Sequence, residues 1–583
     1  MESHEIFEKY IKNRPWTKNY DEGIPAEVTI RPEPLYAYLD RTASSYPERT
    51  AFVYFGSHVK YKTLADHSDR VAKALREMGV SKGDIVALYM PNHPAFAVAF
   101  YAAAKIGATV TPMNPLYTPG EVARQARDSE ARVLFTADVQ YDKAIKANEE
   151  YRFEKVIVAE MTEYMPAWLK PIARRQIRAP RIKYGGAVVK YAELLSYEAE
   201  GYRAAVKPEE DVVALMYTGG TTGTPKGAEI THANISSNLQ QLKPFYDVVR
   251  RSRGIGADAP LVLVGVLPWY HIYGQVTVLH YSIFDGDTVL VYPRFDLKKI
   301  LSDIGKYKAS VFHGVPTIFN AIVNSVDVRR YDLTSLAFCI SGSSPLPVEL
   351  ARRFEAATGA PLREGYGMTE TAVVTHLNPL LNGRHKAGSI GLPLPSTYAA
   401  IADLEKPELL PPGQTGELVI SGPQVMKGYH NRPEENKEAF FNCCGLRWFR
   451  TGDIAYMDEE GYFYIVDRKK DMIKYKGYSV FSREIEEVLY QHPCVKEAAV
   501  IGVPDQEAGE APKAFVVLKD ECKEQIKPAD IIKWASERLA PYKRPRYVEF
   551  RSELPKSAVG KILKRILKEE ELSKWAQTGR SNK

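Results

Sequence analysis

The sequence predicts an α/β fold for most of the chain, with a β-barrel-like subdomain late in the N-terminal part and a small α+β C-terminal domain. Three observations support this prediction. Helix-like and strand-like segments alternate over 35–138, short strands with glycine turns follow Ser396, and a charge cluster at 467–471 precedes a new α/β pattern. Alternation of this kind is typical of a mostly parallel sheet with helices on its faces.

The N-terminal alternation comes from the spacing of the apolar residues. They recur at helical spacing over 64–78, whereas 84–89 is a short apolar run of the kind found in buried strands. A proline stands at the start of each of the next two helical segments, Pro94 and Pro119. The predicted helices therefore span 64–78, 94–106 and 118–128, and the predicted strands span 84–89 and 109–111.

The charge cluster 467–471 marks the expected domain boundary, with an N-terminal domain over 1–469 and a C-terminal domain over 470–583. Further strands of the N-terminal domain are predicted over 212–216, 261–268, 336–341, 399–402, 416–420 and 461–466. In the C-terminal domain the pattern predicts helices over 484–491, 528–539 and 562–575 and strands over 495–502 and 513–518.

The composition is that of an ordinary globular protein, with 583 residues of which 45% are hydrophobic and 26% are charged. The net charge of +6 is too small over this length to indicate a nucleic-acid partner. The N-terminus lacks the apolar core of a signal peptide. The best apolar run, 95–104, is far shorter than the ~18 residues of a membrane-spanning helix. We therefore expect a cytoplasmic protein that is at most peripheral at a membrane.

The cysteines give no sign of a cross-linked or metal-binding fold. There are five of them: Cys339, Cys443, Cys444, Cys494 and Cys522. Their odd number and their spacing fit neither a disulfide framework nor a zinc site. We interpret them as reduced packing thiols, with Cys443 and Cys444 open to oxidation if they are exposed.

A segment rich in glycine and threonine, 217–227, follows the strand-like run 212–216 and reads Tyr-Thr-Gly-Gly-Thr-Thr-Gly-Thr-Pro-Lys-Gly. Its glycines let backbone N–H groups approach an anion, its threonines add hydroxyl donors, and Lys226 adds a positive charge. It is not a P-loop, because Lys226 follows a proline and is not followed by Ser or Thr. Composition alone leaves a phosphate cradle and a polar surface turn equally open.

Three further motifs carry residue types suited to a nucleotide. In 364–370 an aromatic ring between glycines can stack on a base, and the carboxylate of Glu370 suits Mg²⁺. Asp453 can accept both hydroxyls of a ribose. Lys561 can offset the repulsion between two anions that must meet. Taken alone, each motif is more common as a turn or as a solvated charge.

His271 lies within an aromatic segment, 268–274. A histidine among aromatic residues is most often a packed core residue. The segment offers no buried carboxylate to pair with an amine, so an amino acid substrate is disfavoured.

The segment 217–227 resembles the phosphate-binding loop of the adenylate-forming enzymes, the superfamily of acyl-CoA synthetases, luciferases and peptide-synthetase adenylation domains. The segments 364–370, 451–453, 467–471 and 554–562 resemble later motifs of the same superfamily. The resemblance covers about Leu35 to Leu567 and is closest to long- and medium-chain fatty acid–CoA ligases. It implies two α/β sheet subdomains beside the barrel-like one, and a C-terminal domain that is mobile.

The resemblance also implies roles for individual residues. The implied ATP and AMP site consists of Thr218, Gly219, Gly220, Thr221, Thr222, Gly223, Lys226, Gly342, Ser343, Ser344, Glu364, Gly365, Tyr366, Gly367, Asp453, Ile465 and Arg468. The implied catalytic residues are Lys561, Glu370, Thr369, Lys474 and His271, with Thr218 and Glu370 at Mg²⁺. The implied pivot of the C-terminal domain is Lys470. The implied CoA-binding residues are Lys476, Gly477 and Tyr478. The implied acyl pocket consists of Trp269, His271, Tyr273, Gly314 and Val315. The sequence departs from the family at Ser344, often alanine in relatives, and at Ser482, usually proline.

The implied reaction uses a fatty acid, ATP with Mg²⁺, and CoA. The carboxylate attacks the α-phosphate of ATP, giving acyl-AMP and pyrophosphate. The C-terminal domain then rotates about Lys470, and the thiol of CoA displaces AMP. An aryl-CoA ligase of the 4-coumarate type and a catalytically degenerate lipid-binding relative remain as alternatives, and relatives that form dimers leave a homodimer open.

A basic insertion over 161–186 interrupts the α/β pattern. Its six basic residues are Lys170, Arg174, Arg175, Arg178, Arg181 and Lys183, and apolar residues lie between them. Pro171 and Pro180 are expected to limit any helix to 172–179, and spacing by four could place Lys170, Arg174 and Arg178 on one helical face. A solvated charged insertion and a contact with an anionic membrane surface are both open.

Overall fold

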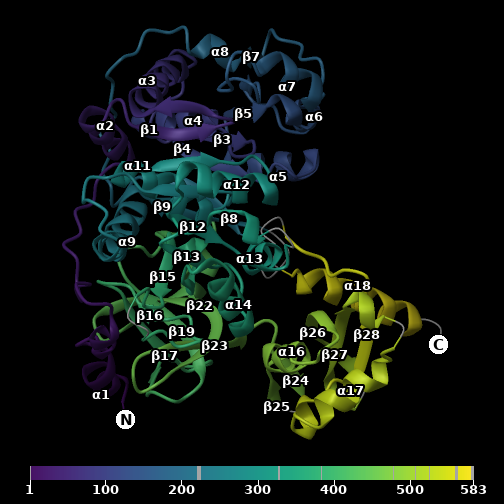
Figure 1. The fold of residues 1–583 in the computed structure, drawn as a ribbon. Helices are drawn as coiled ribbons and strands as arrows, with labels where there is room; N and C mark the ends of the chain where they lie inside the picture. Colours follow the sequence, from purple (N-terminus) through teal and green to yellow (C-terminus); the bar gives the residue numbers. More distant parts are fainter. Residues whose placement is uncertain are drawn as a thin grey trace. The chain divides into compact units, whose positions relative to one another are not determined.

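A computed structural model describes residues 2–218, 225–325, 328–381, 384–476, 478–505, 507–523, 525–557 and 562–579 (Figure 1). The chain forms two compact units. The N-terminal unit comprises Arg14–Tyr398 and Ile420–Phe440, and the C-terminal unit comprises Met1–Asn13, Ala399–Val419 and Phe441–Lys583.

One mixed sheet of eight strands contains the ends of the glycine-rich loop. In spatial order its strands are β20 (Gly428–Tyr429), β9 (Lys226–Thr231), β8 (Val212–Thr218), β4 (Thr109–Met113), β3 (Ile85–Tyr89), β5 (Val133–Ala137), β6 (Lys155–Ala159) and β7 (Val188–Lys190). The pairs from β8 to β7 are parallel, whereas β9 is antiparallel to both β8 and β20. The predicted parallel core is therefore confirmed, with an antiparallel edge that the loop itself creates.

The second sheet of the N-terminal unit has nine strands. In spatial order they are β16 (Leu392–Pro393), β15 (Val373–Leu377), β14 (Leu362–Met368), β13 (Phe338–Ser341), β12 (Val311–Gly314), β10 (Val262–Gly265), β11 (Thr288–Val291), β1 (Thr50–Tyr54) and β2 (Ser57–Lys60). Its middle strands are parallel, and each edge ends in antiparallel strands. Ligand sites of such sheets form at the carboxyl ends of the parallel strands.

Helices cover both sheets of the N-terminal unit. They are α2 (Leu35–Ser45), α3 (Tyr61–Glu77), α4 (Pro94–Lys105), α5 (Pro119–Ser129), α6 (Tyr141–Glu150), α7 (Lys170–Ile177), α8 (Tyr191–Leu194), α9 (His232–Ser252), α10 (Ile272–Gly274), α11 (Tyr281–Asp285), α12 (Leu297–Tyr307), α13 (Pro316–Val323), α14 (Val348–Thr358) and α15 (Pro433–Ala439). All of α4 is buried, which explains why its sequence lacks charged residues before Lys105. At α5, Thr118 and Glu121 form a capping box that fixes the start of the helix.

The C-terminal unit is built on two smaller sheets. The six-stranded sheet lies mostly in this unit and contains β17 (Tyr398–Ala402), β18 (Leu409–Leu410), β19 (Gly416–Ser421), β21 (Phe440–Cys443), β22 (Leu446–Met457) and β23 (Phe463–Arg468). The five-stranded sheet contains β24 (Ile473–Tyr475), β25 (Tyr478–Val480), β26 (Val495–Asp505), β27 (Gly509–Leu518) and β28 (Tyr547–Phe550). The helices α16 (Ser482–Tyr490), α17 (Pro528–Ser536) and α18 (Lys564–Gly579) accompany the second sheet (Figure 1). The predicted α/β class with a small α+β C-terminal part is confirmed.

The helix of the basic insertion differs from its prediction. It spans Lys170–Ile177 instead of 172–179, because Pro171 occupies the first turn, where no backbone N–H needs a partner. Arg178 has the left-handed backbone conformation and ends the helix. The expectation that Lys170, Arg174 and Arg178 share one helical face is therefore wrong for Arg178.

The interpretation of all five cysteines as reduced thiols is also wrong. Cys494 and Cys522 form a disulfide with their Cα atoms 5.6 Å apart. The antiparallel pair β26 and β27 brings the two residues together, because Val495 at the start of β26 pairs with Leu518 at the end of β27. Cys339, Cys443 and Cys444 are free thiols, with the Sγ atoms of Cys443 and Cys444 3.1 Å apart.

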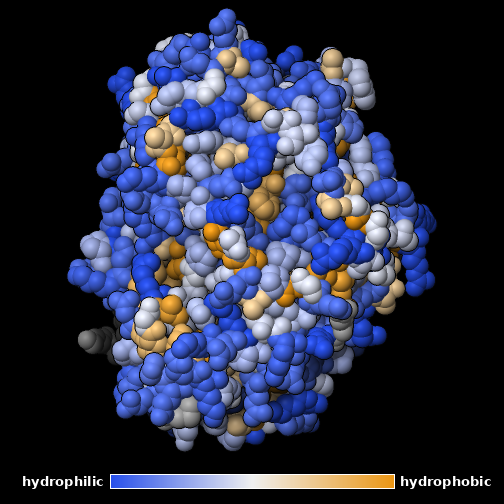
Figure 2. Space-filling view, turned by 90° about the vertical axis from the view of Figure 1, so that its left-hand side faces the viewer, coloured by the Kyte–Doolittle hydropathy of each residue, from blue (hydrophilic) through white to orange (hydrophobic). Residues whose placement is uncertain are grey.

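Within the described part of the chain, no helix is long and apolar enough to cross a membrane. Figure 2 shows one face of the molecule, on which hydrophobic residues form separate patches among hydrophilic ones.

Candidate active site

The glycine-rich loop is held at both ends by a tight pair of strands. Thr218, the last residue of β8, pairs with Lys226, the first residue of β9. The loop residues Gly219, Gly220, Thr221, Thr222 and Gly223 lie outside the described residues. Near the base of the loop, the hydroxyl of Tyr217 donates to the carboxylate of Asp128 over 2.6 Å. The hairpin therefore places the hydroxyl residue and the lysine of the predicted cradle side by side.

Lys226 and Glu370 meet at a tyrosine that the sequence did not single out. The hydroxyl of Tyr429 donates to Oε1 of Glu370 over 2.9 Å, and Nζ of Lys226 lies 5.4 Å from the centre of the same ring. Glu435 Oε1 lies 3.7 Å from Nζ of Lys226. Burial, followed by the charge of Glu370, raises the pKa of Tyr429, so the phenol keeps the proton that it donates.

The strand pairing explains why these residues converge. Tyr429 in β20 pairs with Ala228 in β9, two residues after Lys226. Glu370 follows β14 in a short 3₁₀ turn, Thr369–Thr371, and its backbone carbonyl accepts from the N–H of Met426. The contacts thus join three segments that are far apart in the sequence. We call Lys226, Glu370, Tyr429 and Glu435 the phosphate-side cluster.

The cluster suits Mg²⁺ bound together with phosphate, rather than a metal held by protein alone. No group of three His, Cys, Asp or Glu side chains that could hold a metal occurs within the described residues. Glu370 is a buried carboxylate beside the basic end of the loop. Mg²⁺ at nucleotide sites is commonly bound by one or two carboxylates, with the other positions taken by phosphate oxygens and water.

The predicted motif 364–370 begins on strand β14. This strand pairs with a parallel neighbour on one side and with an antiparallel neighbour on the other. Glu364 pairs with Ser341 of the parallel neighbour β13, whereas Tyr366 pairs with His376 of the antiparallel neighbour β15. A Cβ atom on Gly367 would lie 1.4 Å from the carbonyl oxygen of Val373, so only glycine fits there. Gly365 lies between these positions on the same strand. The motif therefore begins where the parallel pairing with β13 ends and continues in the antiparallel pairing with β15.

The segment after β13 lies beside this strand. The N–H of Gly342 donates to the carbonyl oxygen of Gly314, at the end of β12, over 3.1 Å. Ser343 has a positive φ of 69°, and Ser344 follows it. The carboxylate of Glu364 accepts from the N–H of Leu346 over 3.2 Å, which ties the segment back to β14. The predicted residues of 342–344 and 364–367 are thus brought together at one sheet edge.

The predicted acyl-pocket residues divide into two groups. Tyr273 and Gly314 lie beside Gly342, because a Cβ on Gly342 would be 3.0 Å from the ring of Tyr273 and Gly342 contacts Gly314. Trp269 is fully buried and packs near Phe52 at 5.4 Å between ring centres. Trp269 therefore packs in the core, and its place in the acyl pocket stays a prediction.

His271 and Val315 each precede a helix. Nδ1 of His271 accepts from the N–H of Tyr273 over 3.2 Å and caps α10. Val315 is the residue before α13 and is buried. The hydroxyl of Tyr273 donates to the carbonyl oxygen of Ile340 over 3.1 Å. His271 therefore fixes the start of the helix that positions Tyr273.

In the C-terminal unit, Asp453 and Arg468 are neighbours on adjacent strands. They pair in the register of β22 and β23, and Nε of Arg468 lies 3.0 Å from Oδ1 of Asp453. Asp453 is almost fully buried, whereas Arg468 is partly exposed. Ile465 pairs with Ala455 in the same ladder. The ion pair holds the carboxylate predicted to bind ribose.

The residues after the predicted pivot lie on β24, β25 and the turn between them. Burial, followed by the nearby charge of Arg468, lowers the pKa of Lys470. The backbone N–H of Lys474 donates to Glu510, and that of Lys476 donates to the carbonyl oxygen of Ala508. Tyr478 is 57% exposed and stacks on Tyr542. Gly477 and Lys561 lie outside the described residues.

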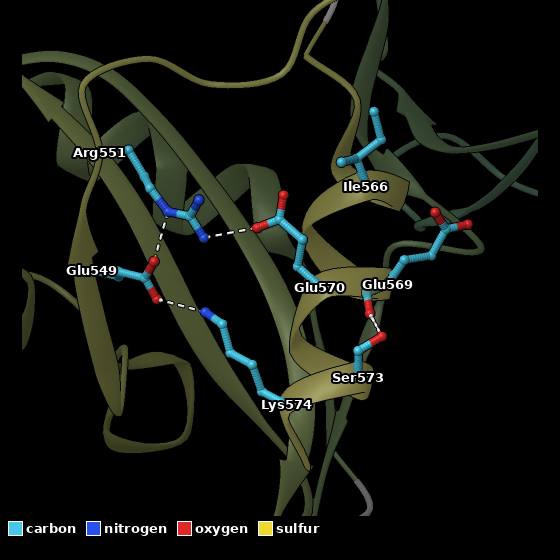
Figure 3. Close-up of a pocket in the computed structure, with 7 residues that line it drawn as sticks. All are labelled: Glu549, Arg551, Ile566, Glu569, Glu570, Ser573 and Lys574. Atoms are coloured by element: carbon cyan, nitrogen blue, oxygen red, sulfur yellow. Dashed lines mark hydrogen bonds and ion pairs between the residues drawn. The ribbon is translucent and has the colours of Figure 1, made fainter. Parts of the chain in front are cut away.

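A cavity of about 750 Å³ lies between β28 and α18 (Figure 3). Its lining residues are Glu549, Arg551, Ile566, Glu569, Glu570, Ser573 and Lys574. Arg551 pairs with Glu570 at 2.8 Å, and Lys574 lies 3.5 Å from Glu549. None of the predicted site residues lines this cavity, and the pairs of Arg551 with Glu570 and of Lys574 with Glu549 tie α18 to the sheet.

Two family models match the chain. The AMP-binding enzyme model covers residues 39–430, and the model of the AMP-binding enzyme C-terminal domain covers residues 484–561. The chain belongs to the AMP-binding enzyme family. The resemblance that the sequence motifs predicted is thereby confirmed.

Relatives of this AMP-binding enzyme match it over nearly the whole chain. A long-chain-fatty-acid–CoA ligase of Bacillus subtilis is 40% identical over 96% of this chain and 98% of that protein. A long-chain-fatty-acid–CoA ligase of Escherichia coli O6:H1 is 38% identical over 95% of this chain and 98% of that protein.

Two solved structures with bound nucleotide share the fold of this AMP-binding enzyme. ATP-bound MatB from Rhodopseudomonas palustris aligns with a TM-score of 0.79 and 29% identity over 92% of this chain and 98% of that chain. O-succinylbenzoate–CoA synthetase (MenE) from Bacillus subtilis, with ATP and a magnesium ion, aligns with a TM-score of 0.74 and 27% identity over 91% and 99%.

Proposed function

We propose that this AMP-binding enzyme activates a fatty acid of long or medium chain to its CoA thioester, using ATP with Mg²⁺ and passing through an acyl-AMP intermediate. AMP and pyrophosphate are the other products. Relatives named long-chain-fatty-acid–CoA ligase that are 33–40% identical over nearly the whole chain support this substrate class. The structural observation that carries the proposal is the phosphate-side cluster, where a buried carboxylate and a lysine meet at the base of the glycine-rich loop.

In the first step, the fatty carboxylate attacks the α-phosphorus of ATP and pyrophosphate leaves. Both reactants are anions, so the barrier falls when positive charge is fixed beside the reacting atoms. Lys226 and the threonines around Thr218 would bind the phosphates, and Lys561 would lie between the carboxylate and the α-phosphate. Glu370 would hold Mg²⁺, which when bound offsets the charge of the phosphate oxygens.

The base and the ribose of the nucleotide are assigned to other predicted residues. We assign adenine to the face of Tyr366 and to the segment 342–344, which lie at one sheet edge. We assign the ribose hydroxyls to Asp453, whose carboxylate is already oriented by Arg468. The acyl chain would lie near Trp269, His271, Tyr273, Gly314 and Val315.

In the second step, the thiol of CoA attacks the acyl-AMP and AMP leaves. The two half-reactions need different groups at the same carbon, which a mobile domain can supply in turn. We propose that residues 470–583 rotate about Lys470 against residues 1–469. Rotation would withdraw Lys561 and present Lys474, Lys476, Gly477 and Tyr478 to the acyl-AMP and to the pantetheine arm of CoA.

The decisive test is pyrophosphate release with palmitate, ATP and Mg²⁺, followed by AMP release with CoA over acids from C4 to C18 and aromatic acids. The proposal requires both products with fatty acids, and faster AMP release with fatty than with aromatic acids. Faster turnover of cinnamates would instead establish the 4-coumarate type. Binding of palmitate without pyrophosphate release would establish a lipid-binding relative. Light scattering on the same preparation distinguishes a monomer from a homodimer.

We also propose that the basic insertion 161–186 contacts an anionic membrane surface, where fatty acids are available. Trp168 is 72% exposed and Ile172, four residues later, is 51% exposed. The basic residues Arg175, Arg178, Arg181 and Lys183 are exposed around them. Aromatic and aliphatic side chains among basic residues suit the interface of an anionic bilayer.

Co-sedimentation with vesicles containing anionic lipid tests this contact. Reversal of Arg175, Arg178, Arg181 and Lys183 to glutamate should reduce binding at least about ten-fold, because each basic residue near such a surface contributes about 1 kcal/mol. Reversal of Arg352 and Arg353 on α14 is the control and should leave binding unchanged. Equal binding of the four-charge variant and the wild type would refute the contact.

A further inference from the structure

A set of buried polar contacts in the C-terminal unit bridges the proposed pivot. Asp467 belongs to β23, where it pairs with Ile454 of the six-stranded sheet. Ser482 begins α16, whose residues Ile485 and Leu489 belong to the core of the five-stranded sheet. Lys470 lies between Asp467 and Ser482 in the sequence. A bond between them therefore joins two separate sheets across the point where the chain is proposed to turn.

Ser482 makes this connection with both of its donors. Its hydroxyl lies 2.9 Å from Oδ2 and 3.1 Å from Oδ1 of Asp467, and its backbone N–H also donates to Oδ2. Ser482 is fully buried and Asp467 is almost fully buried. Hydrogen bonds to a charged group are among the stronger ones, and burial protects these from competition by water.

A third residue, Lys564, connects Ser482 to α18. Nζ of Lys564, in the first turn of α18, donates to the hydroxyl oxygen of Ser482 over 2.8 Å and pairs with Glu486 at 2.8 Å. Burial opposes the charge of Lys564, but the carboxylates of Glu486 and Asp467 outweigh it and raise the pKa of Lys564. We call Asp467, Ser482 and Lys564 the pivot latch.

The helix α18 also contacts the pivot itself. Nζ of Lys568 donates to the backbone carbonyl oxygen of Lys470 over 3.0 Å and lies 3.5 Å from Asp471. The middle of α18 is tied to the sheet by the pair of Arg551 with Glu570 (Figure 3) and by the pair of Lys513 with Glu571. The helix is thus anchored both to the pivot and to the five-stranded sheet.

We propose that Ser482 is a positioning residue that holds residues 470–583 in one of the two orientations needed by the reaction, through its bonds to Asp467. This inference rests on the proposed rotation about Lys470. Asp467 lies before the pivot and Ser482 after it, so the rotation that exchanges the half-reactions has to break the bonds between them. The latch then sets the balance between acyl-AMP formation and acyl transfer to CoA.

The position of Ser482 allows a clean test. It is the first residue of α16, and proline is well tolerated at that position of a helix because its N–H has no partner within the helix. The preceding residue, Phe481, has the extended backbone that proline requires before it. Ser482→Pro should therefore keep the helix while removing both donors, Ser482→Ala removes the hydroxyl alone, and Ser482→Thr keeps both.

The first measurement is the ratio of two rates: acyl-AMP formation, followed by ATP–pyrophosphate exchange, and transfer from supplied acyl-AMP to CoA. Ser482→Ala should change this ratio at least about five-fold, as expected for loss of a hydrogen bond to a charged group. Ser482→Pro should change it further in the same direction, and Ser482→Thr should restore it to within about two-fold. Ser573→Ala, which removes a hydroxyl bonded only within α18, is the control. A loss of equal factor in both rates would overturn the proposal.

The second measurement does not depend on activity. Amide hydrogen exchange of peptides covering 468–476, in the ligand-free protein, should be at least about five-fold faster in Ser482→Ala than in the wild type. It should be unchanged in Ser573→Ala. Unchanged exchange in Ser482→Pro would refute the latch even if the protein is an active ligase. Faster exchange in a protein that activates no acid would instead refute the proposed function and leave the latch established.

Discussion

The phosphate-side cluster and the pivot latch are both built from hydrogen bonds to a buried carboxylate. In the cluster these bonds have to persist through the reaction, whereas in the latch they have to break during it. In the cluster, Tyr429 donates to Glu370 and lies against Lys226, and all three belong to the N-terminal unit. In the latch, Ser482 donates to Asp467 across the proposed pivot. Contacts within one compact unit can hold charged groups in place before the substrate arrives, which is the condition for electrostatic catalysis. Contacts across a pivot favour one orientation of the residues that follow it. They have to be weak enough to break when those residues rotate between the two half-reactions.

The largest effect on a rate is expected when Lys561, the charged residue that the proposed rotation withdraws, is replaced. Lys561→Ala should lower the rate of acyl-AMP formation about 10³-fold, the upper range for loss of one group that stabilises a transition state. Transfer of supplied acyl-AMP to CoA should be retained. Lys556→Ala in the same motif, where the lysine pairs with Glu497, is the control and should leave both rates nearly unchanged. An equal loss of both half-reactions would contradict the role of Lys561.

A change at the pivot itself should separate the two half-reactions in the other direction. Lys470→Pro fixes the backbone φ angle at the residue about which rotation is proposed. Acyl-AMP formation should stay within about three-fold of the wild type, while acyl transfer to CoA should fall at least about 100-fold. Lys470→Ala removes the side chain but leaves the backbone free, so it should retain both steps. Intact overall turnover in Lys470→Pro would argue against a pivot at this residue.

A change within the phosphate-side cluster should slow acyl-AMP formation. It should not change which orientation residues 470–583 adopt. Tyr429→Phe removes the hydroxyl that donates to Glu370, so acyl-AMP formation should fall about ten-fold and the Mg²⁺ concentration for half-maximal rate should rise. The rate of amide hydrogen exchange in peptides covering 468–476 should not change. Tyr464→Phe, which removes a hydroxyl bonded to Asp458, is the matched control. An unchanged Mg²⁺ requirement would show that Tyr429 does not orient the metal-binding carboxylate.

The smallest effect on the reaction is expected at the disulfide. Cys494→Ser opens a cross-link between residues 28 apart in the sequence and should lower the free energy of unfolding of the C-terminal domain by about 2–4 kcal/mol. The ratio of the half-reactions should not change, because neither cysteine belongs to the latch. Denaturant unfolding measures the first effect, and a non-reducing peptide map identifies the bond. A map in which Cys494 is free in the native protein would contradict the cross-link.

Local sequence signals predicted the individual elements well where the helix starts are marked. The predicted helix 118–128 is observed as Pro119–Ser129, because Thr118 and Glu121 cap it. The helix of the basic insertion was displaced by two residues, because Pro171 can enter a first turn and the sequence reading treated it as a barrier. Tyr429 was missed because its partner Glu370 lies 59 residues away and only the pairing of β20 with β9 brings them together.

The sequence by itself determined the α/β class, the residue types at the predicted nucleotide site and the membership of the family, because apolar spacing, turn residues and motif spelling are local properties of the chain. Only the tertiary structure decided that Tyr429 contacts Glu370, that Ser482 bonds to Asp467 and that Cys494 joins Cys522. Such pairs depend on the order in which strands assemble into sheets, and no local preference of either partner encodes that order.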